Sequence, residues 1–448
     1  VDQVLANYIY VFYAAFIVSF VFTPIVRAIA LYYGIIDRPD QVRKMHTAPV
    51  AYLGGLAVFL GWLCGLVVSQ SLLLHRHDPG WPTEHPMVRF SIVLGALVIV
   101  MLGLWDDVIG LRPWMKIAGQ VFAATCLLLD NIGTQAARPI INIIAIKAGQ
   151  FLFGPHFTIS GEGHDWLVAL VSSFMVIAIV VGCCNASNLM DGLDGLCGGV
   201  TAIIAASFLF VAVHLAMEGG GVNTNWDALR VIMGLALLGA VLGFIPFNFN
   251  PASIFMGDTG SMFLGYVCAT MIITMAREQS RWILASMVMF ALPILDTALA
   301  FARRWVNGRP LFSADKQHFH HQLVARGFSV KQTVLISYSL AVFFGLLGIT
   351  MLFVRTRYAG AIYLVTFGSI IVAAYKMGMV HEKPLSGDAT TLEDADAGSF
   401  TTPEISPAGV MEVHPDRPSS QSDLGAAQED SGVHPSEPSL KPALTNVR

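Results

Sequence analysis

Amide and acidic side chains follow directly on a very apolar run in the stretch CCNASNLMDGLDGL, residues 183–196. Asn188, Asp191 and Asp194 recur every three residues, so neighbouring members share a helix face. Together with Asn185 they cover more than one turn, and the intervening glycines predict a bent backbone. A polar helix cap would account for one aspartate, but hardly for two with two asparagines. The set instead suits a nucleotide or a hydrated cation.

Three further carboxylates lie at similar boundaries. Asp106 and Asp107 end an apolar run, and neighbouring carboxylates repel each other unless a cation or a proton lies between them. Asp258, in FMGDTGS, stands at the predicted start of a helix, where backbone N–H groups favour anions. Two interpretations stay open at this point: a solvated acid pair with a helix cap, or ligands for a metal beside a phosphate.

The most cationic loop of the chain carries three histidines. His318, His320 and His321 stand with Lys316 and, upstream, Arg303 and Arg304. Clustered histidines would allow zinc. The carboxylates elsewhere, however, are hard oxygen ligands that suit Mg²⁺ (Mn²⁺ being possible) together with substrate phosphates. Histidine and lysine then serve as donors to phosphate oxygens.

The elements that must position these residues are membrane helices. The chain has 448 residues, of which 55% are hydrophobic and 12% charged, about half the charged fraction typical of soluble domains. Runs of spanning length predict an all-α polytopic integral membrane protein. Eleven transmembrane helices are expected, over residues 8–33, 53–74, 87–105, 114–129, 166–184, 196–217, 228–249, 260–275, 282–302, 333–353 and 358–379. Segment 138–163, rich in β-branched residues and glycine, predicts an interfacial hairpin.

Numbering the connections places nearly all the polar residues of interest on one face, because they follow the first, third, fifth, seventh and ninth helices. Near that face lie 13 Lys and Arg residues, against 9 on the other. The positive-inside rule then favours a site that faces the cytoplasm. Two domains are expected: a transmembrane domain over residues 1–380, and a disordered acidic, Pro/Ser-rich cytoplasmic tail over residues 381–448, where 12 acids face 4 bases.

The combined face predicts phosphoryl transfer between a water-soluble nucleotide and a lipid-borne phosphate. A cation-coupled transporter is the alternative from another class, since intramembrane acids often mark ion paths. It would place acids near the midplane, often in paired half-repeats. Only Asp296 lies deep within a predicted span, where pairing with Arg303 or Arg304, or a hydrogen bond to a neighbouring helix, would explain it. Nothing in the composition indicates nucleic-acid binding.

Four motifs resemble those of the polyprenyl-phosphate N-acetylhexosamine-1-phosphate transferases. They are WDDVIGLRPWMKIAGQ, NASNLMDGLDGLCGGV, NPASIFMGDTGSMFLG and DKQHFHHQLVARGFS, in the same order and on one face. RKMHTAPVAYLGGLAV also fits, although Ala51-Tyr52 stands where the family would have a Pro-Arg-type pair. The phospho-MurNAc-pentapeptide translocases share the aspartate motifs. The surroundings of the histidines, ADKQHFHHQL, are closer to the branch that loads GlcNAc-1-phosphate to start O-antigen, teichoic acid or related polymers.

The resemblance implies a role for each matching residue. Asp258 is the expected Mg²⁺ ligand, with Asp107 beside it, and Phe255 the aromatic that stacks on uracil. Asp106 and Asp107 would meet the lipid phosphate, and Lys116 would bind phosphate. Asn188, Asp191, Asp194 and Asn248 match nucleotide-pocket positions, and the histidines would meet the pyrophosphate or sugar. Further expected binding residues are Asn185, Arg303, Arg304, Lys316, Lys44 and His46.

The implied reaction is transfer of GlcNAc-1-phosphate from UDP-GlcNAc to undecaprenyl or decaprenyl phosphate. Direct attack by the lipid phosphate is expected, and a two-step route through an aspartyl-phosphate is the alternative. Family likeness also implies a possible homodimer. The expected partners are therefore the two substrates, the lipid bilayer and a second copy of the chain.

Overall fold

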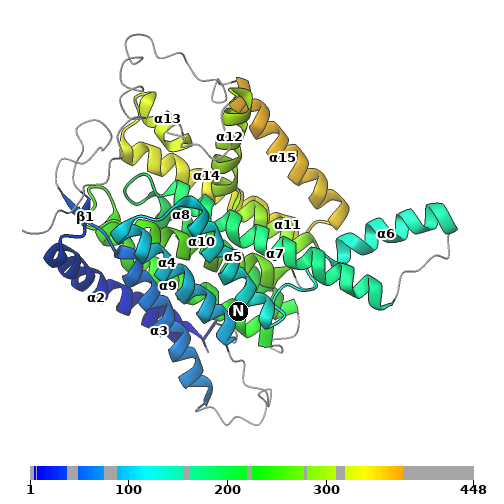
Figure 1. Ribbon diagram of the computed structural model, residues 1–448, viewed down its shortest axis with the longest axis horizontal. Helices are drawn as coiled ribbons and strands as arrows, with labels where there is room; N and C mark the ends of the chain where they lie inside the picture. Colours follow the sequence, from blue (N-terminus) through cyan, green and yellow to red (C-terminus); the bar gives the residue numbers. More distant parts are fainter. Residues whose placement is uncertain are drawn as a thin grey trace, which may run out of the picture. The chain divides into compact units, whose positions relative to one another are not determined.

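Helices make up nearly all of the regular structure (Figure 1). The computed structural model describes residues 5–6, 8–37, 49–74, 88–154, 161–218, 225–276, 280–308 and 318–376. Its elements are α2 (Ile9–Tyr33), β1 (Ile36–Asp37), β2 (Val50–Ala51), α3 (Gly54–Leu74), α4 (Phe90–Ile109), α5 (Pro113–Leu129), α6 (Arg138–Phe153), α7 (Glu162–Met190), α8 (Leu196–Glu218), α9 (Asn225–Asn248), α10 (Gly257–Met275), α11 (Ser280–Met289), α12 (Ala291–Val306), α13 (Phe319–Ala325), α14 (Val330–Leu352) and α15 (Thr356–Lys376).

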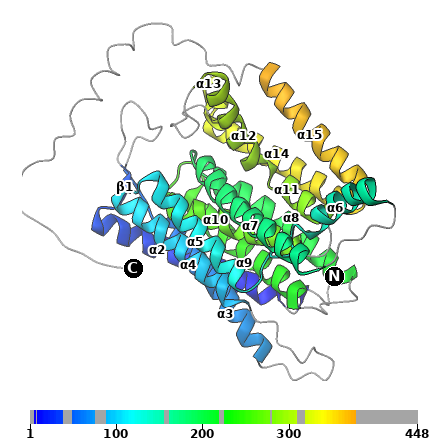
Figure 2. The same cartoon turned by 45° about the vertical axis from the view of Figure 1, so that its right-hand side comes forward.

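Helix α10 lies at the centre of the helices that carry the motifs, as Figure 2 shows. It packs against α3, α4, α7, α8, α9 and α11. Every residue of α10 is buried except Asp258, in its first turn. The one side chain of this helix that reaches the surface is therefore the carboxylate predicted to bind a metal.

Glycines bring other helices close to the start of α10. A Cβ atom on Gly55, in α3, would lie 2.1 Å from the backbone nitrogen of Gly260. A Cβ atom on Gly103, in α4, would lie 2.4 Å from Cα of Thr259. No larger residue fits at either position without moving backbone atoms, so these glycines set how closely α3 and α4 approach the site.

Helices form in all of the predicted spans, but fewer of these helices are long and apolar enough to cross a membrane. Within the described ranges, seven helices are long and apolar enough to cross a membrane: α2, α3, α4, α7, α8, α9 and α14. An eighth results if α11 and α12 form one broken span. Helices α5 and α15 are shorter apolar helices. A polytopic all-helical protein is confirmed, and the count of eleven stays a prediction.

The predicted span over residues 282–302 is not one straight helix. It breaks at Phe290 into α11 and α12, which meet at a bend of 74°. Pro293 explains the break, because it has no N–H to donate to the Met289 carbonyl and its ring crowds that carbonyl. The bend redirects α12, which carries Asp296 and the two arginines.

The prediction of an interfacial hairpin over residues 138–163 was wrong, because Arg138–Phe153 form the helix α6. Ala137, Ile141 and Ala145, four residues apart, pack against Val168 of α7. The helical period therefore outweighs the strand preference of the isoleucines. Figure 1 shows α6 at the edge of the molecule, beside the beginning of α7. The predicted tail over residues 381–448 lies outside the described residues.

Candidate active site

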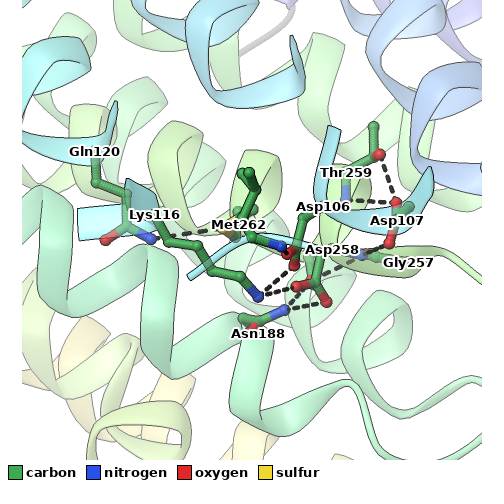
Figure 3. A network of polar contacts seen from close by, with 11 residues as sticks. Asp106, Asp107, Lys116, Gln120, Asn188, Gly257, Asp258, Thr259 and Met262 are labelled. Atoms are coloured by element: carbon green, nitrogen blue, oxygen red, sulfur yellow. Dashed lines mark hydrogen bonds and ion pairs between the residues drawn. The ribbon is translucent and has the colours of Figure 1, made fainter. Parts of the chain in front are cut away.

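Three distant segments meet at Asp258 (Figure 3). The ammonium group of Lys116, at the start of α5, lies 2.7 Å from Oδ2 of Asp258. The amide of Asn188, near the end of α7, donates to Oδ1 at 2.8 Å and to the Ser261 hydroxyl at 3.0 Å. The fold thus places the predicted metal ligand, phosphate-binding lysine and nucleotide-pocket asparagine in direct contact.

Asp106 and Asp107 point in different directions. Asp106 forms an ion pair with Lys116 through Oδ2, while its Oδ1 accepts the Leu111 N–H at 2.7 Å. The ammonium group of Lys116 therefore bridges Asp106 and Asp258. A cation between carboxylates was expected, but it lies between these two rather than within the adjacent pair.

Asp107 instead caps the start of α10. Its Oδ1 accepts the Asp258 N–H at 2.8 Å, and its Oδ2 accepts the Thr259 N–H at 3.0 Å and the Thr259 hydroxyl at 2.6 Å. Met256, the residue before α10, provides no side-chain cap. A carboxylate from α4 thus satisfies amides that the helix itself leaves unpaired. The metal-binding role expected for Asp107 stays a prediction beside this positioning role.

The remaining members of the MDGLDG segment and Asn248 hold two loops together. Asp194 accepts, through Oδ2, from the Asn250 amide at 2.9 Å and the Ala252 N–H at 3.0 Å. Asn248 accepts the Gly195 N–H at 3.1 Å and donates to the Ile254 carbonyl at 3.0 Å. Both residues thereby fix the segment that leads into α10.

Asp191 lies in the turn after α7, where its backbone N–H donates to the Asn188 carbonyl at 3.2 Å, while its carboxylate makes no hydrogen bond with the residues that the structure describes. Burial, and then the charges of Asp258, Asp107 and Asp194, raise the pKa of Asp191 to about 8. Asp191 is therefore close enough to these carboxylates for their negative charges to disfavour its ionisation. Asp191 is a carboxylate that a cation could recruit.

Asn185 lies one turn before Asn188 and contacts a different partner. Its amide donates to the Gln120 side chain at 2.7 Å and to the Val181 carbonyl at 2.8 Å. Gln120 follows Lys116 by one turn of α5, so this contact aligns α5 with α7 beneath the lysine. The structure does not bring Asn185 to Asp258.

The histidine segment reaches the same end of the bundle. A Cβ atom on Gly192 would lie 2.3 Å from Nε2 of His320, so this imidazole abuts the MDGLDG turn. Burial, and then the charge of neighbouring His321, lower the pKa of His320 to about 3, which leaves it neutral at physiological pH. His318 is also buried, and its Nδ1 lies 3.0 Å from Oδ2 of Asp296.

Phe255 precedes Asp258 by three residues. Its N–H donates to the Ala51 carbonyl at 2.8 Å, and its ring meets that of Tyr52 edge-on at 6.0 Å. Arg303 is buried near the end of α12, and the Arg304 guanidinium lies over the Phe301 ring at 5.6 Å. Neither arginine is shown against Asp258. Lys44, His46 and Lys316 lie outside the described residues.

Several contact residues were not predicted from the sequence: Gln120, Gly192, Thr259, Ser261 and Asp296. Thr259 and Ser261 follow Asp258 in GDTGS, so their hydroxyls could have been expected at the first turn. The contact of Gly192 with His320 depends on tertiary packing that no local pattern reports.

The donor set fits Mg²⁺ better than zinc. Among the described residues, no three His, Cys, Asp or Glu side chains converge as a preformed metal-binding group. Mg²⁺ does not need one, since it usually takes one or two carboxylates together with waters and substrate phosphates. Asp258, with Asp106 and Asp191 nearby, offers hard oxygens at a place where the structure already holds a cation, the Lys116 ammonium group.

Comparison with known proteins identifies the family to which the chain belongs. Residues 89–276 match the family model described as glycosyl transferase family 4. The chain is 30% identical over 384 residues to a probable undecaprenyl-phosphate N-acetylglucosaminyl 1-phosphate transferase of Bacillus subtilis (strain 168), covering 85% of this chain and 95% of that protein. It is 33% identical to a decaprenyl-phosphate N-acetylglucosaminephosphotransferase of Mycobacterium tuberculosis (strain ATCC 25618 / H37Rv), covering 80% and 85%.

A relative from the other branch covers less of the chain. The phospho-N-acetylmuramoyl-pentapeptide-transferase of Bacillus cereus (strain AH187) is 33% identical over 330 residues, or 68% of this chain and 96% of that protein. Identity alone does not separate the branches. The longer shared extent does favour the N-acetylglucosaminyl group.

Proposed function

The chain belongs to the family of the polyprenyl-phosphate N-acetylglucosaminyl 1-phosphate transferases, and we propose that it transfers GlcNAc-1-phosphate from UDP-GlcNAc to undecaprenyl or decaprenyl phosphate. The products are UMP and a polyprenyl-pyrophosphoryl sugar that starts an envelope polysaccharide. The observation that carries this proposal is the bridge of Asp106, Lys116 and Asp258 at the exposed end of α10.

The reaction needs positioning more than proton abstraction. A lipid phosphate oxygen forms a bond to the β-phosphorus of UDP-GlcNAc, and the bond from that phosphorus to the bridging oxygen breaks. UMP leaves with the electron pair. Because a phosphomonoester has a second pKa near 6, the attacking oxygen is mostly deprotonated at neutral pH. Asp106 therefore has no obligatory role as a strong base.

The residues around Asp258 would bind the metal ion, the phosphates and the nucleotide. Bound Mg²⁺ would be held by Asp258, with Asp106, Asp107 or Asp191, and would offset the negative charge of the pyrophosphate. Lys116, displaced from Asp258 by such a cation, would donate to phosphate oxygens. Asn188 would orient the nucleotide, Phe255 would offer its ring face to uracil, and the histidines would donate to the pyrophosphate or sugar.

The orientation in the membrane is part of the proposal. The substrates are a water-soluble nucleotide and a lipid, so the site must lie at a membrane surface. The modest excess of Lys and Arg near the polar loops favours the cytoplasmic face of a bacterial inner membrane. A homodimer belongs to the same proposal and rests on family likeness alone.

Purified protein tests the reaction directly. It is offered polyprenyl phosphate with UDP-GlcNAc, UDP-GalNAc or UDP-MurNAc-pentapeptide, and UMP release is measured. Release from UDP-GlcNAc alone supports the proposal, whereas release from the pentapeptide substrate assigns the chain to the other branch. Asp258→Ala should abolish release while the protein still inserts normally. Near-full turnover by that variant would show that the metal assignment is wrong.

A further inference from the structure

A buried carboxylate outside the bridge of Asp106, Lys116 and Asp258 holds the histidine segment. Asp296, in the first two turns of α12, is 4% exposed. Its Oδ2 lies 3.0 Å from Nδ1 of His318, and its Oδ1 accepts the Phe319 N–H at 2.7 Å. Both oxygens of one carboxylate thus engage two consecutive residues at the start of α13.

This double contact fixes the tautomer and the orientation of His318. An ionised carboxylate only accepts hydrogen bonds, so Nδ1 must carry the proton that the two groups share. The second bond, to Phe319, prevents the segment from rotating about the first. His318 is itself only 6% exposed, so the imidazole has little freedom to adopt another orientation. Nε2 is then the imidazole nitrogen that Asp296 does not engage.

The bend between α11 and α12 explains why a carboxylate can lie there. A straight helix over residues 282–302 would carry Asp296 along the span axis, whereas the 74° break at Phe290 redirects the first turns of α12 toward the start of α13. Asp296 had been expected to pair with Arg303 or Arg304 or to hydrogen-bond a neighbouring helix. The second alternative is confirmed, because its hydrogen bonds are to His318 and Phe319 at the start of α13.

We propose that Asp296 is a positioning residue: it holds His318 with Nδ1 directed at the carboxylate, so that Nε2 is the nitrogen left to meet the substrate. The inference rests on the proposed function and adds a residue that acts through His318. The arrangement matches the general case in which a carboxylate orients a functional imidazole.

The electrostatic surroundings of His318 are mixed. Asp296 faces it from α12, and His320 and His321 lie on α13 with ring centroids 5.8 Å and 6.4 Å away. Arg303 is buried on α12 two turns beyond Asp296. Among these charged or titratable groups of the described residues, Asp296 is the one that forms a hydrogen bond with the His318 imidazole.

Asp296→Asn is the informative variant, because an amide has one acceptor oxygen and cannot serve both His318 and Phe319. We expect kcat to fall by about 10- to 100-fold, the loss typical of removing an orienting partner. The KM for UDP-GlcNAc should stay the same. Thr297→Val is the matched control, since the Thr297 hydroxyl donates only within α12, to Pro293 at 3.0 Å.

A double-variant cycle separates positioning from general stabilisation. If Asp296 acts through His318, then Asp296→Asn adds no further loss of kcat to His318→Gln. Additive losses, or an Asp296→Asn enzyme with wild-type kcat, would overturn the proposal.

A readout independent of turnover completes the test. Protein labelled with ¹⁵N-histidine should show a protonated Nδ1 for His318, assigned by its absence in His318→Gln, and Asp296→Asn should change that signal. An unchanged signal contradicts the proposal. If the wild-type protein releases no UMP, the proposed function fails, while this spectrum still decides whether Asp296 holds His318.

Discussion

The ammonium nitrogen of Lys116 lies 2.7 Å from Oδ2 of Asp258, and the same group also pairs with Asp106. A lysine thus occupies the position between two carboxylates at which a divalent cation would be expected. Under the proposed function, Lys116 and Mg²⁺ would compete for Asp258, and binding of the cation would free the lysine for phosphate. Several predictions can be derived from this competition and from the contacts around it.

Replacement of Lys116 should have opposite effects on turnover and on metal affinity. In Lys116→Met, turnover should fall by about 10²- to 10³-fold, as when one donor to a developing charge is lost. The apparent affinity for Mg²⁺ should rise, because the cation no longer displaces an ammonium group. Titration of UMP release with Mg²⁺ measures both effects. Lys147→Met is the control, because Lys147 is an exposed residue of α6. A lower Mg²⁺ affinity in Lys116→Met would contradict the competition between lysine and metal ion.

Metal binding should depend on pH through Asp191. Its pKa is raised to about 8, so at pH 7 the carboxyl group is mostly protonated before a cation binds. A nearby cation favours the ionised form, and Mg²⁺ binding should therefore release a proton and become tighter as the pH rises toward 8. Calorimetry in buffers of different ionisation enthalpy measures the released proton. Asp191→Asn should abolish this release, and equal release by both proteins would refute the assignment.

Asp107 should matter for stability as well as for activity. Three donors from Asp258 and Thr259 share its two oxygens. Asp107→Asn leaves one acceptor oxygen and should destabilise the start of α10 by about 1–3 kcal/mol. Thermal unfolding in detergent measures this change. Thr259→Val, which removes only the hydroxyl donor, should cost about 1 kcal/mol. If Asp107→Asn loses turnover with no change in thermal stability, the residue acts chiefly on substrate or metal.

A side chain at position 192 should not be tolerated, because His320 occupies the space that a Cβ atom on Gly192 would take. Gly192→Ala places a methyl group 2.3 Å from Nε2 of a buried imidazole. Overpacking of this kind costs about 1–3 kcal/mol, and here it would displace the histidine segment and lower kcat. Gly182→Ala, in α7, is the control, since nothing lies within 4 Å of its added Cβ. Wild-type turnover in Gly192→Ala would show that His320 can move freely.

The two ends of the bundle should be accessible from opposite sides of the membrane. Lys331 begins α14 beside the histidine segment, whereas Lys147 lies on α6, between the far ends of α5 and α7. With the native cysteines replaced, Lys331→Cys should react with an impermeant thiol reagent from the cytoplasm and Lys147→Cys from outside. The reverse pattern would invert the proposed orientation. Labelling of both from one side would contradict the topology.

The sequence was most informative where residue type alone implies chemistry. Carboxylates and amides at the ends of apolar runs predicted that Asp258 and Asn188 belong to one site, and the family resemblance added Lys116. The fold brings the three into contact. It could not predict which partner each carboxylate takes. Asp106 and Asp107 are adjacent in sequence, yet one faces Lys116 and the other the amides of α10, since successive side chains of a helix point in different directions.

Helix geometry was harder to predict than helix location. Apolar runs located the helices, but hydropathy does not report the break that Pro293 imposes or the resulting position of Asp296. In the segment of α6, β-branched residues suggested strands, whereas the four-residue spacing of Ala137, Ile141 and Ala145 fits a helix packed on α7. Tertiary packing decided that segment, and local propensity did not.

The burial of α10 among other helices, at every residue but Asp258, has a consequence for how the enzyme responds to its surroundings. Because those helices should keep acyl chains away from α10, the spacing of Asp258, Lys116 and Asn188 should be insulated from bilayer thickness and from the identity of a detergent. Changes of rate between micelles, nanodiscs and native membranes should then report on delivery of the lipid substrate, while the arrangement around Asp258 stays constant.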